Sequence, residues 1–212
     1  MTTALLLVDI QNDFLPGGAL AVAEGDTVVS VANRLMPAFD HVIATQDWHP
    51  PQHKSFAAEH AGKQPFDVVD LDGLEQILWP VHCVQGTPGA SFAAELDVAP
   101  IDAVVRKGSA ERIDSYSAFF DNGHRQDTGL THLLRARGID AVAVMGLAAD
   151  VCVAYTVHDA LAEGFAVTLV TDGVRGVNMQ PGDTDRSIEA MREAGAVITD
   201  SASTLDAVRG GC

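Results

Sequence analysis

Basic residues and cysteines are scarce in this chain. Its 212 residues include 13 Lys and Arg against 29 Asp and Glu, and only three Cys. The formal net charge of -16 argues against nucleic acid or an anionic membrane as a partner, because both are bound through positively charged surfaces. Three cysteines at no framework spacing favour reduced thiols over disulfides. Lysine occurs only at positions 54, 63 and 107, so the setting of each lysine is informative.

Long apolar runs and nucleotide-binding patterns are also missing. No run approaches the roughly 18 apolar residues of a membrane span, and the N-terminus lacks the basic segment of a secretory signal. We therefore expect a cytoplasmic protein. No Gly-x-Gly-x-x-Gly or P-loop pattern follows a predicted strand, which argues against a nucleotide cofactor. The length and the 47% hydrophobic content suit a single domain over residues 1–212.

Strand-like apolar segments alternate with segments of helical periodicity. The predicted strands cover residues 4–8, 41–45, 103–107, 139–145, 166–171 and 196–198, and the predicted helices cover 26–39 (with Asp26 as its cap), 128–137, about 150–161 and 185–194. This order predicts an α/β fold, a three-layer sandwich with a mainly parallel, doubly wound sheet flanked by helices on both faces. Residues from about 48 to 100 are predicted to form a long functional loop insertion with short helices.

Polar or reactive groups follow several of the predicted strands. They are Asp9, Asp47, Lys107, the turn over residues 148–152, and Asp172. In doubly wound sheets, ligands bind beyond the carboxyl ends of the strands. The sequence therefore predicts a functional site at this edge of the sheet.

Cys152 lies where the predicted strand 139–145 gives way to a helix. A thiol in a first helical turn faces unpaired backbone N–H groups and the positive end of the helix dipole, and both favour the thiolate. Asp9 supplies a carboxylate base and Lys107 a cation that lowers the thiol pKa, while the backbone N–H groups of Ala148 and Cys152 can form an oxyanion hole. The alternative is a buried Asp–Lys pair beside an inert cysteine.

A second group of side chains has the composition of a metal site. Asp47 and His49 are two residues apart, so in extended backbone both face the same way, and His82 is the third candidate ligand. One carboxylate and two imidazoles with open positions describe a catalytic site for zinc, iron or manganese. The alternative is a set of surface or hydrogen-bonded histidines without an ion.

The chain resembles the nicotinamidase/pyrazinamidase branch of the isochorismatase-like cysteine hydrolase superfamily. The resemblance rests on seven segments, at residues 8–14, 46–50, 53–57, 79–84, 107–108, 114–122 and 146–153. It implies a catalytic triad of Asp9, Lys107 and Cys152. It also implies one divalent metal ion on Asp47, His49 and His82, with His53 in the outer sphere. The pyridine pocket would be walled by Phe14, Leu20, Trp79 and Tyr116, and the Leu147–Ala148 peptide would be cis. Ala149 departs from the threonine of many relatives.

The function that this resemblance implies is hydrolysis of nicotinamide to nicotinate and ammonia through a cysteine thioester, in NAD salvage. Pyrazinamide would be a further substrate, and the formation of a homo-oligomer is left open. Two alternatives remain: a cysteine amidohydrolase acting on another small carboxamide, and a metal-binding module whose thiol senses oxidants. A cysteine phosphatase is disfavoured, because the residue six beyond Cys152 is His158 and no phosphate-clamping arginine is near.

Overall fold

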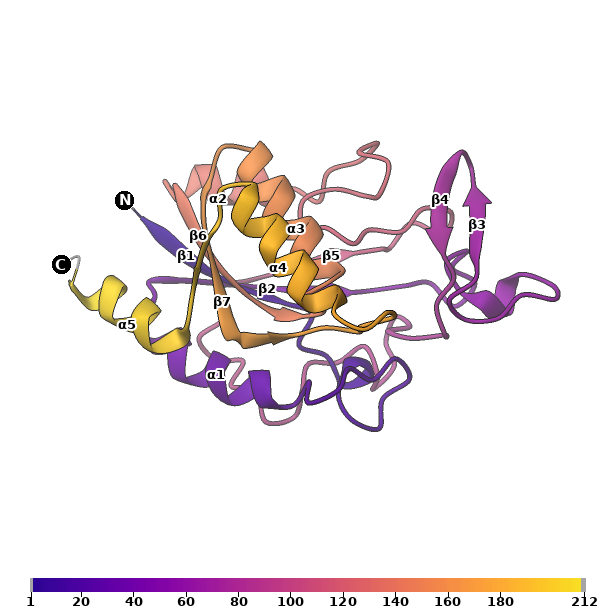
Figure 1. Ribbon diagram of the computed structural model, residues 1–212, viewed down its shortest axis with the longest axis horizontal. Coiled ribbons are helices and arrows are strands. Elements are labelled where there is room, and N and C mark those ends of the chain that lie inside the picture. Colours follow the sequence, from indigo (N-terminus) through magenta and orange to yellow (C-terminus); the bar gives the residue numbers. More distant parts are fainter. Residues whose placement is uncertain (1, 211–212) are drawn as a thin grey trace.

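A computed structural model describes residues 2–210, and its main feature is a six-stranded parallel sheet (Figure 1). The strand order is β5-β2-β1-β6-β7-β8, so the chain winds outward from β1 in both directions. The strands are β1 (Thr3–Val8), β2 (His41–Asp47), β5 (Ala103–Lys107), β6 (Ala141–Leu147), β7 (Ala166–Arg175) and β8 (Val197–Thr199). All five neighbouring pairs are parallel, which confirms the doubly wound sheet.

Helices cover both faces of this sheet (Figure 1). On one face, α1 (Thr27–Leu35) and α5 (Ser201–Gly210) pack on β7; on the other, α3 (Cys152–Ala162) packs on β6 and β7 and against α4 (Asp183–Glu193). The helix α2 (Leu130–Ala136) lies on the same side as α3. Three short 3-10 helices complete the list, η1 (Asn12–Phe14), η2 (Met36–Ala38) and η3 (Ala57–Glu59). The predicted three-layer sandwich is confirmed.

The central strands β1 and β6 form the most buried part of the core. Residues 4–8 of β1 are at most 1% exposed, because they have a strand on each side and helices on each face. Val8 pairs with Gly146, which has a φ of 124°. A Cβ at this position would collide with the Val8 carbonyl, so only glycine fits. This close approach places the residue after β1 beside the turn after β6, and both belong to the candidate site.

The insertion over residues 48–100 contains more regular structure than expected. It holds an antiparallel hairpin, β3 (Val68–Leu71) and β4 (Leu74–Ile77), which projects from the body of the molecule (Figure 1). Its two turn residues, Asp72 and Gly73, both have positive φ. A two-residue turn of this geometry favours an Asp-Gly pair, which is a strong hairpin signal in a sequence. The insertion contains a short helix, η3, as predicted, but the hairpin was not predicted.

Two helix predictions also need correction. The predicted helix 26–39 ends at Leu35 and continues only as η2, and the Asp26 side chain makes no capping hydrogen bond. Asp26 itself has helical dihedral angles, and backbone bonds from Thr27 to Glu24 and from Val28 to Gly25 already satisfy the first amides. The C-terminal helix α5 was not predicted.

Within residues 2–210, none of the helices combines the length and the apolar character that crossing a membrane requires.

Candidate active site

Three buried groups meet at the edge of the sheet where the parallel strands end. Asp9 follows β1, Lys107 ends β5, and Cys152 is the first residue of α3. The Lys107 Nζ lies 2.8 Å from the Asp9 Oδ2 and 3.4 Å from the Cys152 Sγ. Asp9 and Lys107 are at most 1% exposed and Cys152 is 6% exposed. The structure therefore brings together the carboxylate, the cation and the thiol that the sequence singles out.

Lys107 is surrounded by acceptors. Its ammonium donates to the Asp47 Oδ1 at 2.6 Å, the Ser115 carbonyl at 2.9 Å and the Cys152 Sγ at 3.4 Å. An ammonium has only three hydrogens, so the Asp9 ion pair at 2.8 Å competes with these acceptors. Among the described residues, the Asp9 Oδ2 receives no hydrogen bond. This oxygen is thus free to accept a proton from the neighbouring thiol.

Burial controls the protonation of these groups. It raises the pKa of the Cys152 thiol well above its ordinary value, although Lys107 acts in the opposite direction. Burial also raises the pKa of Asp9, against the attraction of Lys107. For Lys107, burial is outweighed by Asp47 and Asp9, which raise its pKa well above the ordinary value. The expectation of a lowered thiol pKa was therefore wrong, because desolvation exceeds the effects of the cation and the helix terminus.

The turn between β6 and α3 exposes backbone donors next to the thiol. The Leu147–Ala148 peptide is cis, as the resemblance implied. The Ala148 carbonyl accepts from the Val151 and Val153 N–H groups. By contrast, the N–H groups of Ala148 and Cys152 have no acceptor within residues 2–210. Both donors are available for a substrate oxygen, which is the requirement of an oxyanion hole.

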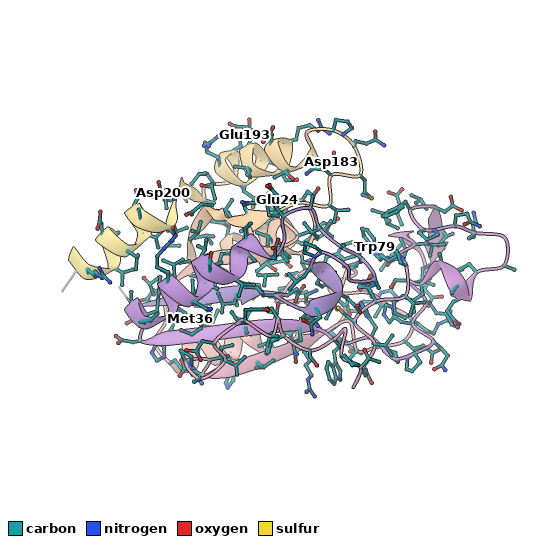
Figure 2. The ribbon with its side chains drawn as sticks, turned by 90° about the horizontal axis from the view of Figure 1, so that it is seen from below. Glu24, Met36, Trp79, Asp183, Glu193 and Asp200 are labelled. Atoms are coloured by element: carbon teal, nitrogen blue, oxygen red, sulfur yellow. The ribbon has the colours of Figure 1, made fainter. Side chains whose placement is uncertain are left out.

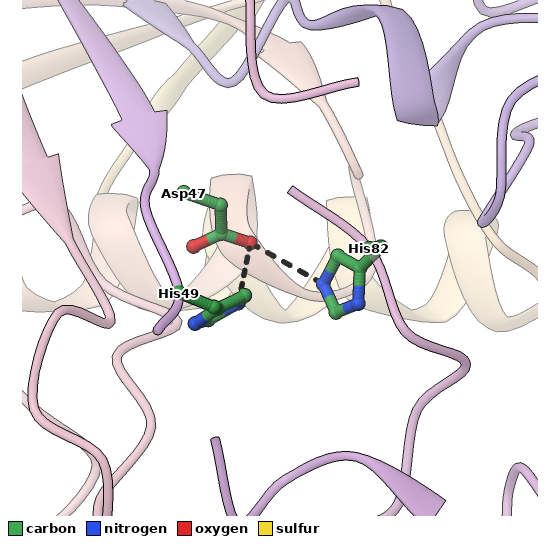
Figure 3. Close-up of side chains that lie close together, drawn as sticks. All are labelled: Asp47, His49 and His82. Atoms are coloured by element: carbon green, nitrogen blue, oxygen red, sulfur yellow. Dashed lines mark ion pairs between the residues drawn. The ribbon is translucent and has the colours of Figure 1, made fainter. Parts of the chain in front are cut away.

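Asp47, His49 and His82 converge next to this triad (Figure 3). The Asp47 Oδ2 lies 3.5 Å from the His49 Nε2 and 3.7 Å from the His82 Nε2. Each ring is anchored through its other nitrogen, with the His49 Nδ1 2.8 Å from the Gly108 carbonyl and the His82 Nδ1 2.8 Å from the Pro80 carbonyl. A carbonyl can only accept, so each Nδ1 carries a hydrogen, and each Nε2 faces Asp47 and can bind an ion when it carries no hydrogen.

This donor set fits a divalent ion. The His49 Nε2 is buried and has no hydrogen-bond partner in the described chain, which is costly for a polar atom unless something binds it. One carboxylate oxygen and two imidazole nitrogens with anchored rings match an open, catalytic type of metal site. The Gln11 side chain fixes the backbone of Asp47 through two hydrogen bonds. It accepts from the Asp47 N–H at 2.8 Å and donates to the Asp47 carbonyl at 2.9 Å.

His53 lies beside these three groups but does not join them. Its Nδ1 is 2.7 Å from the Ser55 hydroxyl and its Nε2 is 3.2 Å from the Ile113 carbonyl, so both nitrogens have protein partners. Its ring packs on that of His49 with centroids 4.3 Å apart. The buried Asp114 carboxylate lies close to both histidines. This arrangement agrees with a place for His53 outside the first ligand sphere.

A small cavity opens onto both groups. Phe14, Leu20, Trp79 and Tyr116, the four expected wall residues, all line it, together with Asp47, His82, Asp114, Ala148, Val151, Cys152 and Val177. Trp79 lies toward the end of the molecule that carries the hairpin (Figure 2). Ala149 is fully buried and is not among the lining residues, so its departure from threonine does not change the cavity wall.

One predicted member of the site lies elsewhere. Asp172 belongs to a bulged part of β7, since Val144 pairs with Leu169 but Gly146 pairs with Val174. The bulge directs the Asp172 carboxylate to Ser201, whose N–H donates to it at 2.7 Å at the start of α5. Asp172 is therefore a helix cap rather than a site residue.

Asp114 and Gln11 were not predicted as site residues. Asp114 lies in an irregular loop, where no periodicity reports which way a side chain points. Gln11 lies in the segment 8–14 of the resemblance, but its two bonds to the Asp47 backbone depend on tertiary contacts.

Known proteins resemble this chain over most of its length. The model of the isochorismatase domain matches residues 3–203. The chain is 53% identical to a nicotinamidase of Escherichia coli (strain K12), covering 92% of this chain and 93% of that protein. Its structure resembles that of a nicotinamidase/pyrazinamidase of Acinetobacter baumanii, with a TM-score of 0.93, 45% identity and coverage of 96% and 98% of the two chains. It also resembles the pyrazinamidase of Pyrococcus horikoshii in complex with zinc, with a TM-score of 0.78, 35% identity and coverage of 94% and 99%.

Proposed function

The chain belongs to the isochorismatase domain family, and we propose that it acts within that family as a nicotinamidase, which hydrolyses nicotinamide to nicotinate and ammonia. The observation that carries this proposal is a single cavity lined by both Cys152 and the candidate metal ligands Asp47 and His82. A nucleophile and a metal site on one small cavity suit a carboxamide on a nitrogen heterocycle, because each end of the substrate then has its own partner. Pyrazinamide offers the same two groups, and the products place the reaction in NAD salvage.

The Cys152 thiol begins the proposed reaction. Its sulfur forms a bond to the amide carbon while its proton passes to the Asp9 Oδ2, which is paired with Lys107. The carbonyl oxygen becomes an oxyanion and accepts from the free N–H groups of Ala148 and Cys152. The carbon–nitrogen bond then breaks, and the proton on Asp9 passes to the leaving nitrogen, which departs as ammonia.

Water completes the cycle by the reverse proton path. Asp9 accepts a proton from a water molecule, whose oxygen attacks the carbon of the thioester. The carbon–sulfur bond breaks, nicotinate is released, and the sulfur regains its proton from Asp9. Lys107 holds the Asp9 and Asp47 carboxylates at fixed positions throughout and keeps Asp9 ionised enough to act as a base.

Asp47, His49 and His82 are the residues that would hold a divalent ion. When bound, such an ion supplies a Lewis-acid site for the ring nitrogen of the substrate. The zinc complex of the Pyrococcus horikoshii relative supports zinc, and iron and manganese are the other metals suited to this donor set. The aromatic side chains of Phe14, Trp79 and Tyr116 can enclose the ring, with Leu20 as an aliphatic neighbour.

The burial of the thiol counts against the redox-sensor alternative. Cysteines that sense oxidants are solvent-accessible, whereas Cys152 is 6% exposed. A cytoplasmic location and self-association into a homo-oligomer stay predictions.

The proposal is tested by ammonia release from nicotinamide, pyrazinamide and other small carboxamides, with metal analysis of the same preparation. We expect nicotinamide to be hydrolysed with the highest kcat/KM and about one metal ion per chain. A preparation with full metal content that hydrolyses another carboxamide but not nicotinamide would contradict the assignment.

A further inference from the structure

The β3–β4 hairpin reaches the cavity wall through one buried side chain. Gln76 of β4 is 3% exposed, whereas its neighbour Glu75 is exposed. The Gln76 Nε2 lies 2.7 Å from the Ile77 carbonyl, 2.9 Å from the Tyr116 hydroxyl and 3.3 Å from the Asp114 Oδ2. Two of these partners, Tyr116 and Asp114, line the cavity.

The chemistry of these partners identifies the amide nitrogen. A carbonyl and a carboxylate oxygen only accept hydrogen bonds, so the Gln76 atom between them is the donor. An amide nitrogen carries two hydrogens. Judged by distance, Gln76 donates its two hydrogens mainly to the Ile77 carbonyl and the Tyr116 hydroxyl. The longer contact with Asp114 is a weaker hydrogen bond.

The Tyr116 hydroxyl is held from a second side as well. The Trp79 Nε1 donates to it at 3.2 Å, so Gln76 and Trp79 together occupy both of its acceptor sites. The rings of Trp79 and Tyr116 meet edge to face with centroids 6.1 Å apart. Gln76 therefore sets the orientation of two of the aromatic side chains that enclose the cavity.

Within the part of the chain that the structure describes, Gln76 makes the only buried polar contacts between the hairpin and the loop carrying Tyr116. At the hairpin tip, Asp72 pairs with Arg112 at 2.7 Å and its carbonyl accepts from Arg125 at 2.9 Å, but these side chains are largely exposed. Exposed ion pairs contribute little to stability. The buried amide of Gln76 is thus the polar contact best placed to fix the wall.

We propose that Gln76 is a positioning residue for substrate binding, which acts through Tyr116 and Trp79 to hold the wall against the heterocyclic ring. The proposal rests on the proposed function, because the ring is that of nicotinamide. Gln76 does not line the cavity, so its effect is on the fit of the ring and not on the chemistry at Cys152. The hairpin is then an element of substrate specificity.

The test is Gln76→Met, which keeps an unbranched side chain of similar length and removes both donors. Losing the buried hydrogen bonds is expected to raise KM for nicotinamide about tenfold, with kcat within about twofold of the parent. The preference for nicotinamide over a ring-methylated nicotinamide should fall, because a loosened wall discriminates less by shape. Gln64→Met makes the same chemical change at an exposed position of the insertion and should leave KM and preference at parental values.

A double variant shows whether the effect passes through Tyr116. If it does, Gln76→Met with Tyr116→Phe should have about the KM of the more affected single variant, because the two changes remove one shared interaction. Additive effects, an unchanged KM, or a loss of kcat together with slower alkylation of Cys152 would overturn the proposal. Should Gln76→Met not fold, Gln76→Leu also lacks the donors and places no new charge beside Asp114, and the same KM rise is expected of it.

The two proposals fail in different ways. A parent enzyme that releases no ammonia from nicotinamide contradicts the proposed function. A parent that is active, beside a Gln76→Met variant with parental KM and parental preference, contradicts the role of Gln76 alone.

Discussion

Asp9→Asn tests the central claim about proton transfer. The substitution keeps the shape of the side chain and can keep the contact of the Oδ1 with the Thr45 hydroxyl, which is 2.5 Å in the parent. It removes the only carboxylate next to Cys152 whose near oxygen has no donor among the described residues. Burial raises the pKa of the Cys152 thiol, so formation of the thiolate needs a nearby proton acceptor, and the variant lacks the Asp9 carboxylate.

The expected loss is large. A positioned general base contributes about 10²–10⁴ in rate, which corresponds to about 3–5 kcal/mol of transition-state stabilisation. The kcat for nicotinamide and the rate of iodoacetamide alkylation of Cys152 at neutral pH should both fall by about that factor. In the parent, activity should be lost as the pH falls through the raised pKa of Asp9, because its protonated form cannot act as a base.

The fold should tolerate this change. Asp9 and Asp47 share the single cation Lys107, so neutralising Asp9 leaves a balanced buried pair between Lys107 and Asp47. A carboxyl whose folded-state pKa is raised stabilises the fold only below its unfolded pKa, and that contribution is lost as the pH rises through the raised value. At neutral pH the ionised Asp9 is therefore a cost, and Asp9→Asn should melt at or above the parental Tm.

Three measurements decide the matter: ammonia release, the pH dependence of alkylation, and thermal unfolding. Asp13→Asn provides a matched substitution in η1, at a carboxylate that does not contact Cys152. Its carboxylate accepts from the backbone of Cys83 and Ala19, so it should cost stability without removing the proton acceptor. If Asp9→Asn keeps kcat and alkylation within about tenfold of the parent, Asp9 is not the base and the reasoning fails.

Three further predictions separate the two groups of residues. Cys152→Ala should abolish turnover but retain parental metal content and nicotinamide affinity by calorimetry, and residual activity within about tenfold of the parent would exclude a covalent mechanism. His49→Ala should weaken both metal and nicotinamide binding; parental nicotinamide affinity in both His49→Ala and His82→Ala would show that the ring does not bind through an ion at this site. Lys107→Ala should lower the free energy of unfolding by about 3–5 kcal/mol in urea titrations, because two buried carboxylates lose their cation. A loss below about 1 kcal/mol would show that water already screens these carboxylates.

Local patterns in the sequence are enough to predict the sheet and most of the site. Continuous apolar segments mark strands buried on both faces, and the end of a parallel strand is a defined place in space. Asp9, Asp47, Lys107 and Cys152 can therefore be assigned to one sheet edge from the sequence alone. The two-residue spacing of Asp47 and His49 likewise predicts that both face the same way, because side chains alternate along extended backbone.

The tertiary structure decided what these groups do to one another. Desolvation depends on every atom packed around a side chain, and for Cys152 it reversed the pKa shift predicted from its helix position. The β7 bulge, which depends on the pairing of distant residues, removed Asp172 from the site. Only the folded chain shows which acceptors surround Lys107 and that Gln76 of the hairpin donates to Tyr116. Contacts between segments far apart in sequence leave no local pattern.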